Sequence, residues 1–332
     1  RNACGWLKTN GPLRLGRENF TRFTCCKASL TREMQAAGPV TECLRISDCL
    51  FRRDMLGPSV GHMAASVTAL LLVEKLGIDV VLPSLAPSLE ALLAVHGRHM
   101  TLLVAGLAIM SIFFWGVGTL LTLPALLRVT TWKIQANRHT KLLMLFQSLP
   151  LIVFNFLLGV VIFPLVPFLL PDSAFDFAHL PTTAVLCRDI TVWMVVEEVF
   201  FFYLHRLMHE NKWLYQTVHK IHHKWHAPVA LIAIYCHPVE HLLCNILPLL
   251  LGPLLCGSHI AASGIYLATG MIHTTAVHSG YWCCDDNGMH DEHHAKLSVN
   301  FGIFGVMDTL YGTYRLPVGA VGGAASAPAK AD

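Results

Sequence analysis

The chain has 332 residues, of which 54% are hydrophobic and 14% are charged, and its formal net charge is +3. Soluble domains carry about 25% charged residues, so this composition and a mean hydropathy of +0.53 argue against a soluble globular fold. Because the apolar residues also occur in long runs, we expect an integral membrane protein.

The two ends of the chain differ from its middle. Residues 1–57 are basic and contain no apolar core, which argues against a secretory signal. The acidic residues among them disfavour a transit peptide. We expect this N-terminal segment to be poorly ordered, and we expect a disordered Gly/Ala/Ser/Pro-rich tail at residues 316–332.

Four apolar runs are long enough to cross a membrane as helices, at roughly residues 60–82, 101–127, 142–170 and 182–204. The first three, within residues 58–180, make up the expected transmembrane part. Two later runs, 228–256 and 261–281, are interrupted by prolines and histidines. We expect these two to enter the membrane and return. The predicted fold class is therefore all-α, an integral membrane helical bundle of about four spans plus a re-entrant hairpin.

Basic residues predict how the bundle lies in the membrane. Four of them, Arg128, Lys133, Arg138 and Lys141, lie between the second and third runs. More follow the fourth run, whereas the loops near 83–98 and 171–181 hold few. By the positive-inside rule, the N-terminus, the 128–141 loop and the histidine-rich region after the fourth run face the cytosol.

Eight histidines between residues 205 and 294 form three clusters: His205 and His209; His219, His222 and His223; His290, His293 and His294. Their spacings of three and four residues put side chains on one face of a helix. Neutral imidazole is the commonest metal ligand in proteins. One such cluster could arise by chance, but three exceed what a single ion needs. Two ions with open positions are predicted, and iron is favoured because zinc cannot change its oxidation state.

Other residues could complete or support this site. His278 lies twelve residues before the third cluster and could be a further ligand. Carboxylates and histidines nearby could bond to a metal-binding imidazole and orient it. The candidates are Glu198, Asp189, Glu240, His237 and His241. For Glu197 and Glu198, pairing with Arg188 or with a lysine on another helix is an equal alternative.

Several motifs together resemble a known family. They are EEVFFFYLHRLMH (197–209), HKIHHKWHAP (219–228), YCHPVEH (235–241), HSGY (278–281), HDEHH (290–294), NFG (300–302) and DTLYGT (308–313). This pattern resembles the fatty acid hydroxylase / sterol desaturase superfamily. Within it, the pattern is similar to C4-methylsterol monooxygenases and, more closely, to the fatty acid hydroxylase domain-containing protein 2 group. The resemblance identifies residues 181–315 as the expected catalytic region.

The resemblance implies a non-haem di-iron centre, with His205, His209, His219, His222, His223, His278, His290, His293 and His294 as ligands. It also implies O2 as oxidant, with electrons from NAD(P)H through cytochrome b5 and its reductase, and a place in the endoplasmic reticulum membrane. No His-Pro-Gly-Gly segment is present, so the electron carrier would be a separate partner. No nucleic acid partner is expected.

The implied reaction is hydroxylation of a lipid C–H bond, with the 4-methyl group of a sterol as the leading substrate. A fatty acyl or sphingoid hydroxylase or desaturase is the nearest alternative. A catalytically silent lipid-binding relative and a metal transporter are alternatives from other classes. A transporter would carry polar residues within several spans, whereas the second and third runs hold almost none.

Overall fold

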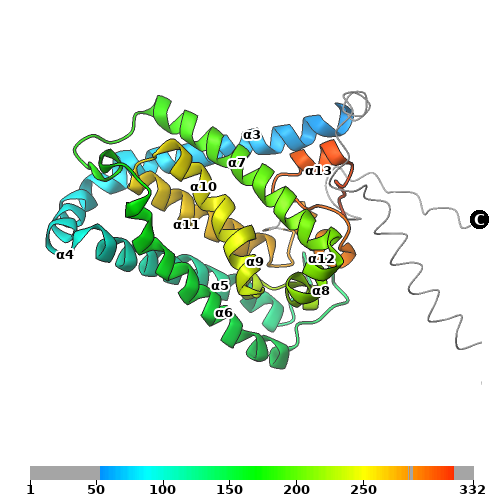
Figure 1. Ribbon diagram of the computed structural model, residues 1–332. Helices are drawn as coiled ribbons and strands as arrows, with labels where there is room; N and C mark the ends of the chain where they lie inside the picture. The colour runs from blue at the N-terminus through cyan, green and yellow to red at the C-terminus, as the bar shows by residue number, and fades with distance from the viewer. Residues whose placement is uncertain (1–52, 283, 285–286, 318–332) are drawn as a thin grey trace, which may run out of the picture. The chain divides into compact units, whose positions relative to one another are not determined.

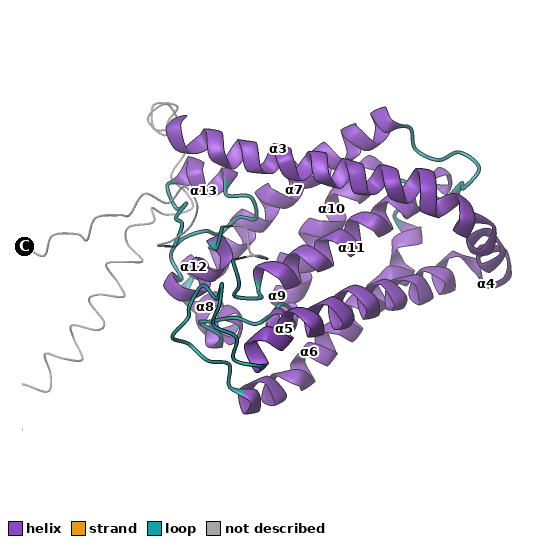
Figure 2. Ribbon diagram, turned by 180° about the vertical axis from the view of Figure 1, so that it is seen from behind, coloured by secondary structure: helices purple, strands orange, loops and turns teal. Residues whose placement is uncertain are grey.

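The computed structural model describes residues 53–282, 284 and 287–317. The predicted disorder at the two ends falls almost entirely outside these residues. Within them the structure is helical and forms no strand, apart from an isolated bridge between Lys133 and Tyr281. The all-α prediction is confirmed (Figure 2).

One long helical run forms the first part of the fold. It consists of α3 (Arg53–Leu76), a π-turn (Gly77–Val81), α4 (Leu82–Met110), a second π-turn (Ser111–Val117) and α5 (Gly118–Leu126). Gly97 interrupts α4 with φ 72° and ψ 168°, a conformation that glycine adopts without a side-chain penalty. The two parts of α4 meet at a kink here, and the ribbon turns back in the region of α4 (Figure 1). The first two predicted spans therefore lie on either side of a bend within one run.

The third predicted span is α6 (Leu142–Ile162), which continues as a 3₁₀ turn (Phe163–Phe168). Its buried Asn155 donates hydrogen bonds to the backbone carbonyls of Ile234 and Cys236, both at 2.8 Å. These bonds hold the segment after the second histidine cluster against the membrane-spanning part of the protein.

The fourth predicted span is α7 (Thr183–Glu210), which Thr182 caps by accepting a hydrogen bond from the Val185 N–H. Among the described helices, four are long and apolar enough to cross a membrane: Ser59–Leu126, Leu142–Phe168, Pro238–Cys256 and Ile260–Val277. Helix α7 is not one of them, because ionisable residues such as Asp189, Glu197 and Glu198 interrupt its apolar sequence.

The segments predicted as a hairpin supply two of these four candidates. The first contains α9 (Pro238–Glu240), a π-turn (His241–Ile246) and α10 (Leu247–Cys256), and the second is α11 (Ile260–Val277). Two of the prolines, Pro238 and Pro248, occupy first-turn positions, where an N–H is not needed, whereas Pro253 lies inside α10. The re-entrant path of this pair and the cytosolic orientation of the histidine-rich end stay predictions.

Short elements gather at the C-terminal end of α7 (Figure 1). They are α8 (Lys212–Thr217), a 3₁₀ turn (His219–Lys224), α12 (Met289–Lys296) and α13 (Val306–Tyr311). The 128–141 loop joins them, since the Ile134 N–H donates to the Gly280 carbonyl at 3.0 Å and the Tyr281 hydroxyl donates to the Val129 carbonyl at 2.8 Å. The three predicted histidine clusters all lie at this end.

Candidate metal centre

The nine predicted histidines fall into two groups, within each of which the possible ligand atoms lie within 4.8 Å of one another. The first group is His205, His209, His219, His223 and His293, and the second is His222, His278, His290 and His294. Eight of these side chains are buried and His290 is half-buried. The structure therefore brings together all the residues that were predicted as ligands.

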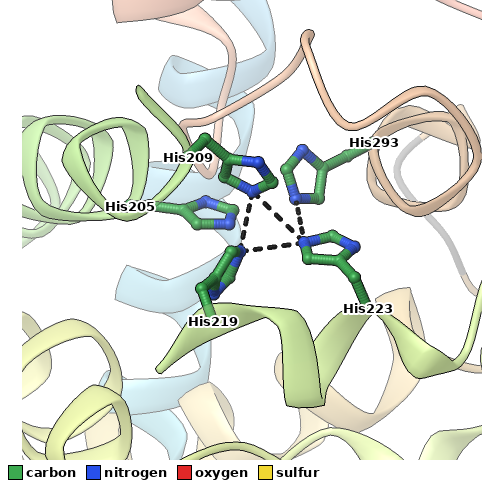
Figure 3. Close-up of side chains that lie close together, drawn as sticks. All are labelled: His205, His209, His219, His223 and His293. Carbon is green, nitrogen blue, oxygen red and sulfur yellow. Dashed lines mark hydrogen bonds between the residues drawn. The ribbon is translucent and has the colours of Figure 1, made fainter. Parts of the chain in front are cut away.

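Three elements supply the first group. Figure 3 shows two rings from α7, two from the 3₁₀ turn and one from α12 pointing toward one another. The Nε2 atoms of His209, His219 and His223 form a triangle with sides of 2.7, 2.9 and 3.2 Å. A fourth, that of His293, lies 3.2 Å from the Nε2 of His223.

The second group is built in the same way. The Nε2 atom of His290 lies 2.9 Å from that of His278 and 3.2 Å from that of His294. The Nε2 of His278 is in turn 3.5 Å from that of His222. The two groups adjoin, because the ring centroid of His294 lies 4.9 Å from that of His223 in the first group.

In five of the nine rings, a hydrogen bond on the opposite side fixes which nitrogen faces inward. Five Nδ1 atoms lie 2.7 to 3.2 Å from backbone carbonyls, which accept the ring proton. The pairs are His205 with Phe301, His222 with Tyr235, His278 with Thr274, His293 with Val299 and His294 with Trp225. A neutral imidazole that donates from Nδ1 presents a lone pair at Nε2.

These inward lone pairs fit a metal ion. Each Nε2 atom can either donate one hydrogen bond or accept one. Hydrogen bonds among the rings therefore cannot pair all three Nε2 atoms of the triangle. A cation can accept all of these lone pairs at once. All-nitrogen ligation suits iron, zinc, copper or nickel. The donor set therefore fits the two metal ions that the sequence predicts.

Burial keeps the imidazoles in the neutral form that binds metals. It lowers the pKa of His219 to about 3 and that of His293 to about 3. Burial, followed by the neighbouring imidazoles, also lowers the pKa of His223 and of His294 well below the ordinary value. Protons therefore compete little with a metal for these four nitrogens near neutral pH.

Of the predicted supporting residues, Glu240 touches a ligand candidate, since its Oε1 lies 2.8 Å from Nδ1 of His219. His237 caps α9 by accepting a hydrogen bond from the Val239 N–H. His241 Nδ1 accepts one from the Asn245 side chain. Asp189 lies sixteen residues before His205, about 24 Å along α7, and accepts a hydrogen bond from Ser258.

Glu198 does not contact a ligand candidate directly but holds a segment that does. Its carboxylate accepts hydrogen bonds from the N–H groups of Ile303, Phe304 and Met307 at 2.8 to 2.9 Å. These bonds hold the segment that begins with Phe301. The Phe301 carbonyl accepts a hydrogen bond from Nδ1 of His205. Arg188, one of the alternative partners considered for Glu198, pairs instead with Asp189 at 2.6 Å.

One contact of the site was not anticipated. The Gln135 side chain donates to Asp291 at 2.7 Å and to the His226 carbonyl at 2.7 Å. Asp291 lies between the ligand candidates of α12, so the 128–141 loop braces that helix. A single glutamine in a loop belongs to no motif, so the sequence carried no signal for this contact.

A cavity of about 340 Å³ adjoins the histidines. Small-molecule sites commonly span about 300–1,000 Å³. His205, His222, His278 and His290 form part of its lining. Much of the remaining lining is apolar and comes from α3, α7, α10, α11 and the segments that connect them, with a few polar side chains such as Glu197 and His273. The cavity thus joins an apolar space within the helices to the metal centre.

Comparison with known proteins agrees with this site. Residues 190–313 match the family model described as fatty acid hydroxylase. Fatty acid hydroxylase domain-containing protein 2 of Macaca fascicularis is 33% identical over 222 residues, which cover 63% of this chain and 66% of that protein. The chain therefore spans just under two thirds of this relative's length.

Two more distant relatives differ in their named activities. Fatty acid hydroxylase ahd1 of Mycosarcoma maydis is 26% identical over 231 residues, covering 67% of this chain and 58% of that protein. Methylsterol monooxygenase 2-2 of Arabidopsis thaliana is 30% identical over 148 residues, covering 40% of this chain and 55% of that protein. No solved structure matches the chain.

Proposed function

We propose that this protein is a membrane-bound non-haem di-iron oxygenase that hydroxylates a C–H bond of a lipid. The match of residues 190–313 to the fatty acid hydroxylase family model supports this proposal. One observation carries the proposal: two groups of inward-facing imidazoles adjoin an apolar cavity. Four candidate spans in the described residues agree with a multi-pass membrane protein.

Iron bound by the two groups would supply oxygen activation, which redox-inactive zinc cannot. The protein's own part is to hold and orient the ligands and to exclude water. Carbonyls such as those of Phe301 and Trp225 fix the rings. The apolar cavity admits a lipid and presents its C–H bond to the centre. In the overall reaction one oxygen atom enters that bond, and the other leaves as water after two electrons and two protons are supplied.

The electrons are proposed to come from NAD(P)H through cytochrome b5 and its reductase, in the endoplasmic reticulum membrane. The histidines are proposed to face the cytosol. The contact of Gln135 with Asp291 supports this orientation, because it joins the basic 128–141 loop to the metal centre. Both would then lie on the cytosolic side by the positive-inside rule.

Two substrate classes have support. A sterol oxidised at its 4-methyl group is supported by the likeness to a methylsterol monooxygenase. A fatty acyl chain is supported by the family model and by the likeness to a fatty acid hydroxylase. Sphingoid substrates, and desaturation in place of hydroxylation, share the same first step of hydrogen abstraction.

Turnover with isotopically labelled O2 tests the proposed function. The iron-loaded full-length protein is supplied with NADH, cytochrome b5 and its reductase, and either a 4-methylsterol or a long-chain fatty acid. We expect label in the product of one substrate and none in a His222→Ala/His293→Ala variant. No label with any lipid, in protein that holds its iron, would favour the silent relative. No bound metal would favour the transporter.

A further inference from the structure

The cavity carries a pair of polar side chains at a distance from the metal centre. On α7, Met194, Glu197, Phe201 and His205 all line the cavity, and their spacing puts them on one helical face. This face therefore leads from the metal centre to Glu197. On the facing helix α11, Tyr266 also lines the cavity.

Glu197 and Tyr266 are bonded to each other at the wall of the cavity. The Tyr266 hydroxyl donates a hydrogen bond to Oε2 of Glu197. The ring of Trp193, one turn before Glu197, packs against Tyr266 with centroids 4.9 Å apart. These contacts link α7 to α11 and hold the carboxyl group in place.

The carboxyl group of Glu197 keeps unused bonding capacity. The described residues supply Tyr266 as its hydrogen-bond partner, through one oxygen. The adjacent Glu198 differs, because three backbone N–H groups bond to its two oxygens. A polar group in apolar surroundings costs free energy unless it is bonded, and ionisable groups inside membranes usually mark functional sites. The second oxygen of Glu197 is therefore suited to a ligand in the cavity.

The pair lies well away from the iron ligands. Glu197 lies eight residues before His205, which is about 12 Å along an α-helix. Phe201 lies between them, with its ring 4.9 Å from that of His205. A ligand that reached both the Glu197–Tyr266 pair and the metal centre would place an apolar portion over Phe201.

We propose that Glu197 and Tyr266 bind a hydroxyl group of the lipid, so that the oxidised C–H bond lies roughly 10 Å from the anchored oxygen. This inference rests on the proposed function and narrows its substrate class. In a 4-methylsterol the hydroxyl group and the oxidised methyl group sit on adjacent ring carbons, too close to span this distance. The anchor therefore selects a long-chain lipid that bears a hydroxyl group far from the oxidised carbon.

The first experiment measures binding alone, in full-length protein without reductant, with 1-hexadecanol and hexadecane as a matched pair. We expect the wild type to bind the alcohol about tenfold more tightly, the upper end of what one net hydrogen bond contributes. Glu197→Leu should remove this preference and Tyr266→Phe should weaken it. Glu197→Gln, which keeps an oxygen acceptor, should retain most of it.

Thr269→Val is the matched control. Thr269 also lines the cavity, but its hydroxyl already donates to the Ile265 carbonyl within the helix. This variant should keep the full preference for the alcohol. Equal binding of the alcohol and the alkane by the wild type would overturn the proposal. An undiminished preference in Glu197→Leu, or no binding of either probe by the wild type, would overturn it as well. Gel filtration and iron content show whether each variant is folded.

The second experiment locates the oxidised carbon in tetradecanol, hexadecanol and octadecanol. An anchored hydroxyl group predicts oxidation at the same position counted from that group in all three alcohols. In the Glu197→Leu variant, the position of oxidation should no longer be constant when counted from the hydroxyl group. A position in the wild type that shifts with chain length would contradict the anchor. If none of them is oxidised, the proposed function fails on these lipids, while the binding result still decides whether the anchor exists.

Discussion

His222 and His223 are consecutive residues, yet their side chains belong to different groups of the candidate metal centre. Their ring planes meet at 79°, with centroids 5.4 Å apart. The pair His293 and His294 is divided in the same way, with ring planes at 81°. Each of these two histidine boxes therefore contributes to both groups. This sharing ties the two candidate ion sites to the same two backbone segments.

Single ligand variants should separate the two ion sites. His222→Ala removes a nitrogen from the second group, and His293→Ala removes one from the first. We expect each single variant to keep about one iron per chain and the double variant to keep almost none, because structural ligands determine metal affinity. Iron content of detergent-purified protein, by elemental analysis, is the measurement. His96→Ala, an exposed histidine outside both groups, is the control. Two retained irons in the double variant would refute the assignment.

Loss of the Glu240 carboxylate should weaken metal binding without removing a ligand. Glu240 contacts the Nδ1 side of His219 at 2.8 Å, and such partners orient the ring and raise its basicity. We expect Glu240→Ala to lower metal affinity by roughly 10- to 100-fold. Chelator competition measures this affinity. Asp172→Asn, at an exposed carboxylate far from the histidines in the chain, should leave it unchanged. Equal affinities in the Glu240→Ala variant and the wild type would show that the contact is incidental.

Glu198 should matter for stability because it holds three backbone N–H groups of the 301–307 segment. Replacing it with alanine leaves the N–H groups of Ile303, Phe304 and Met307 without their acceptor. Each buried unsatisfied group costs about 1–3 kcal/mol. We expect a clear fall in the unfolding temperature in detergent, with Glu90→Gln on the exposed surface of α4 as the control. An unchanged unfolding temperature would mean that the 301–307 segment is held by other contacts.

The sequence predicted which histidines gather in the structure because their spacing is a local property. Imidazoles three or four residues apart can meet whatever the rest of the fold is. The division of neighbours such as His222 and His223 between two groups was not predictable, since it depends on a 3₁₀ turn at His219–Lys224 and on how α12 faces it. Helical spacing alone would have kept the cluster together.

The carboxylates of α7 show what helical spacing in the sequence cannot predict. Glu198 lies seven residues before His205, so the helical pattern placed both on one face. The partner of Glu198 is nevertheless a loop about a hundred residues later in the chain, and tertiary contacts of this kind leave no trace in local spacing. The same limit applies to α7, whose ionisable residues are bonded to other parts of the fold, as Glu197 is to Tyr266.

Close packing of α10 on α7 gives a stability test that is independent of the metal. A Cβ added to Gly252 would lie 2.6 Å from the Cα of Trp193, so α10 would have to move away from α7. Overpacking of this kind costs about 1–3 kcal/mol. We expect Gly252→Ala to lower the unfolding temperature in detergent. Gly116→Ala is the matched control, because its added Cβ meets no atom within 4 Å and alanine favours a helix. If the two variants unfold at the same temperature, α10 and α7 are not packed as closely as this contact requires.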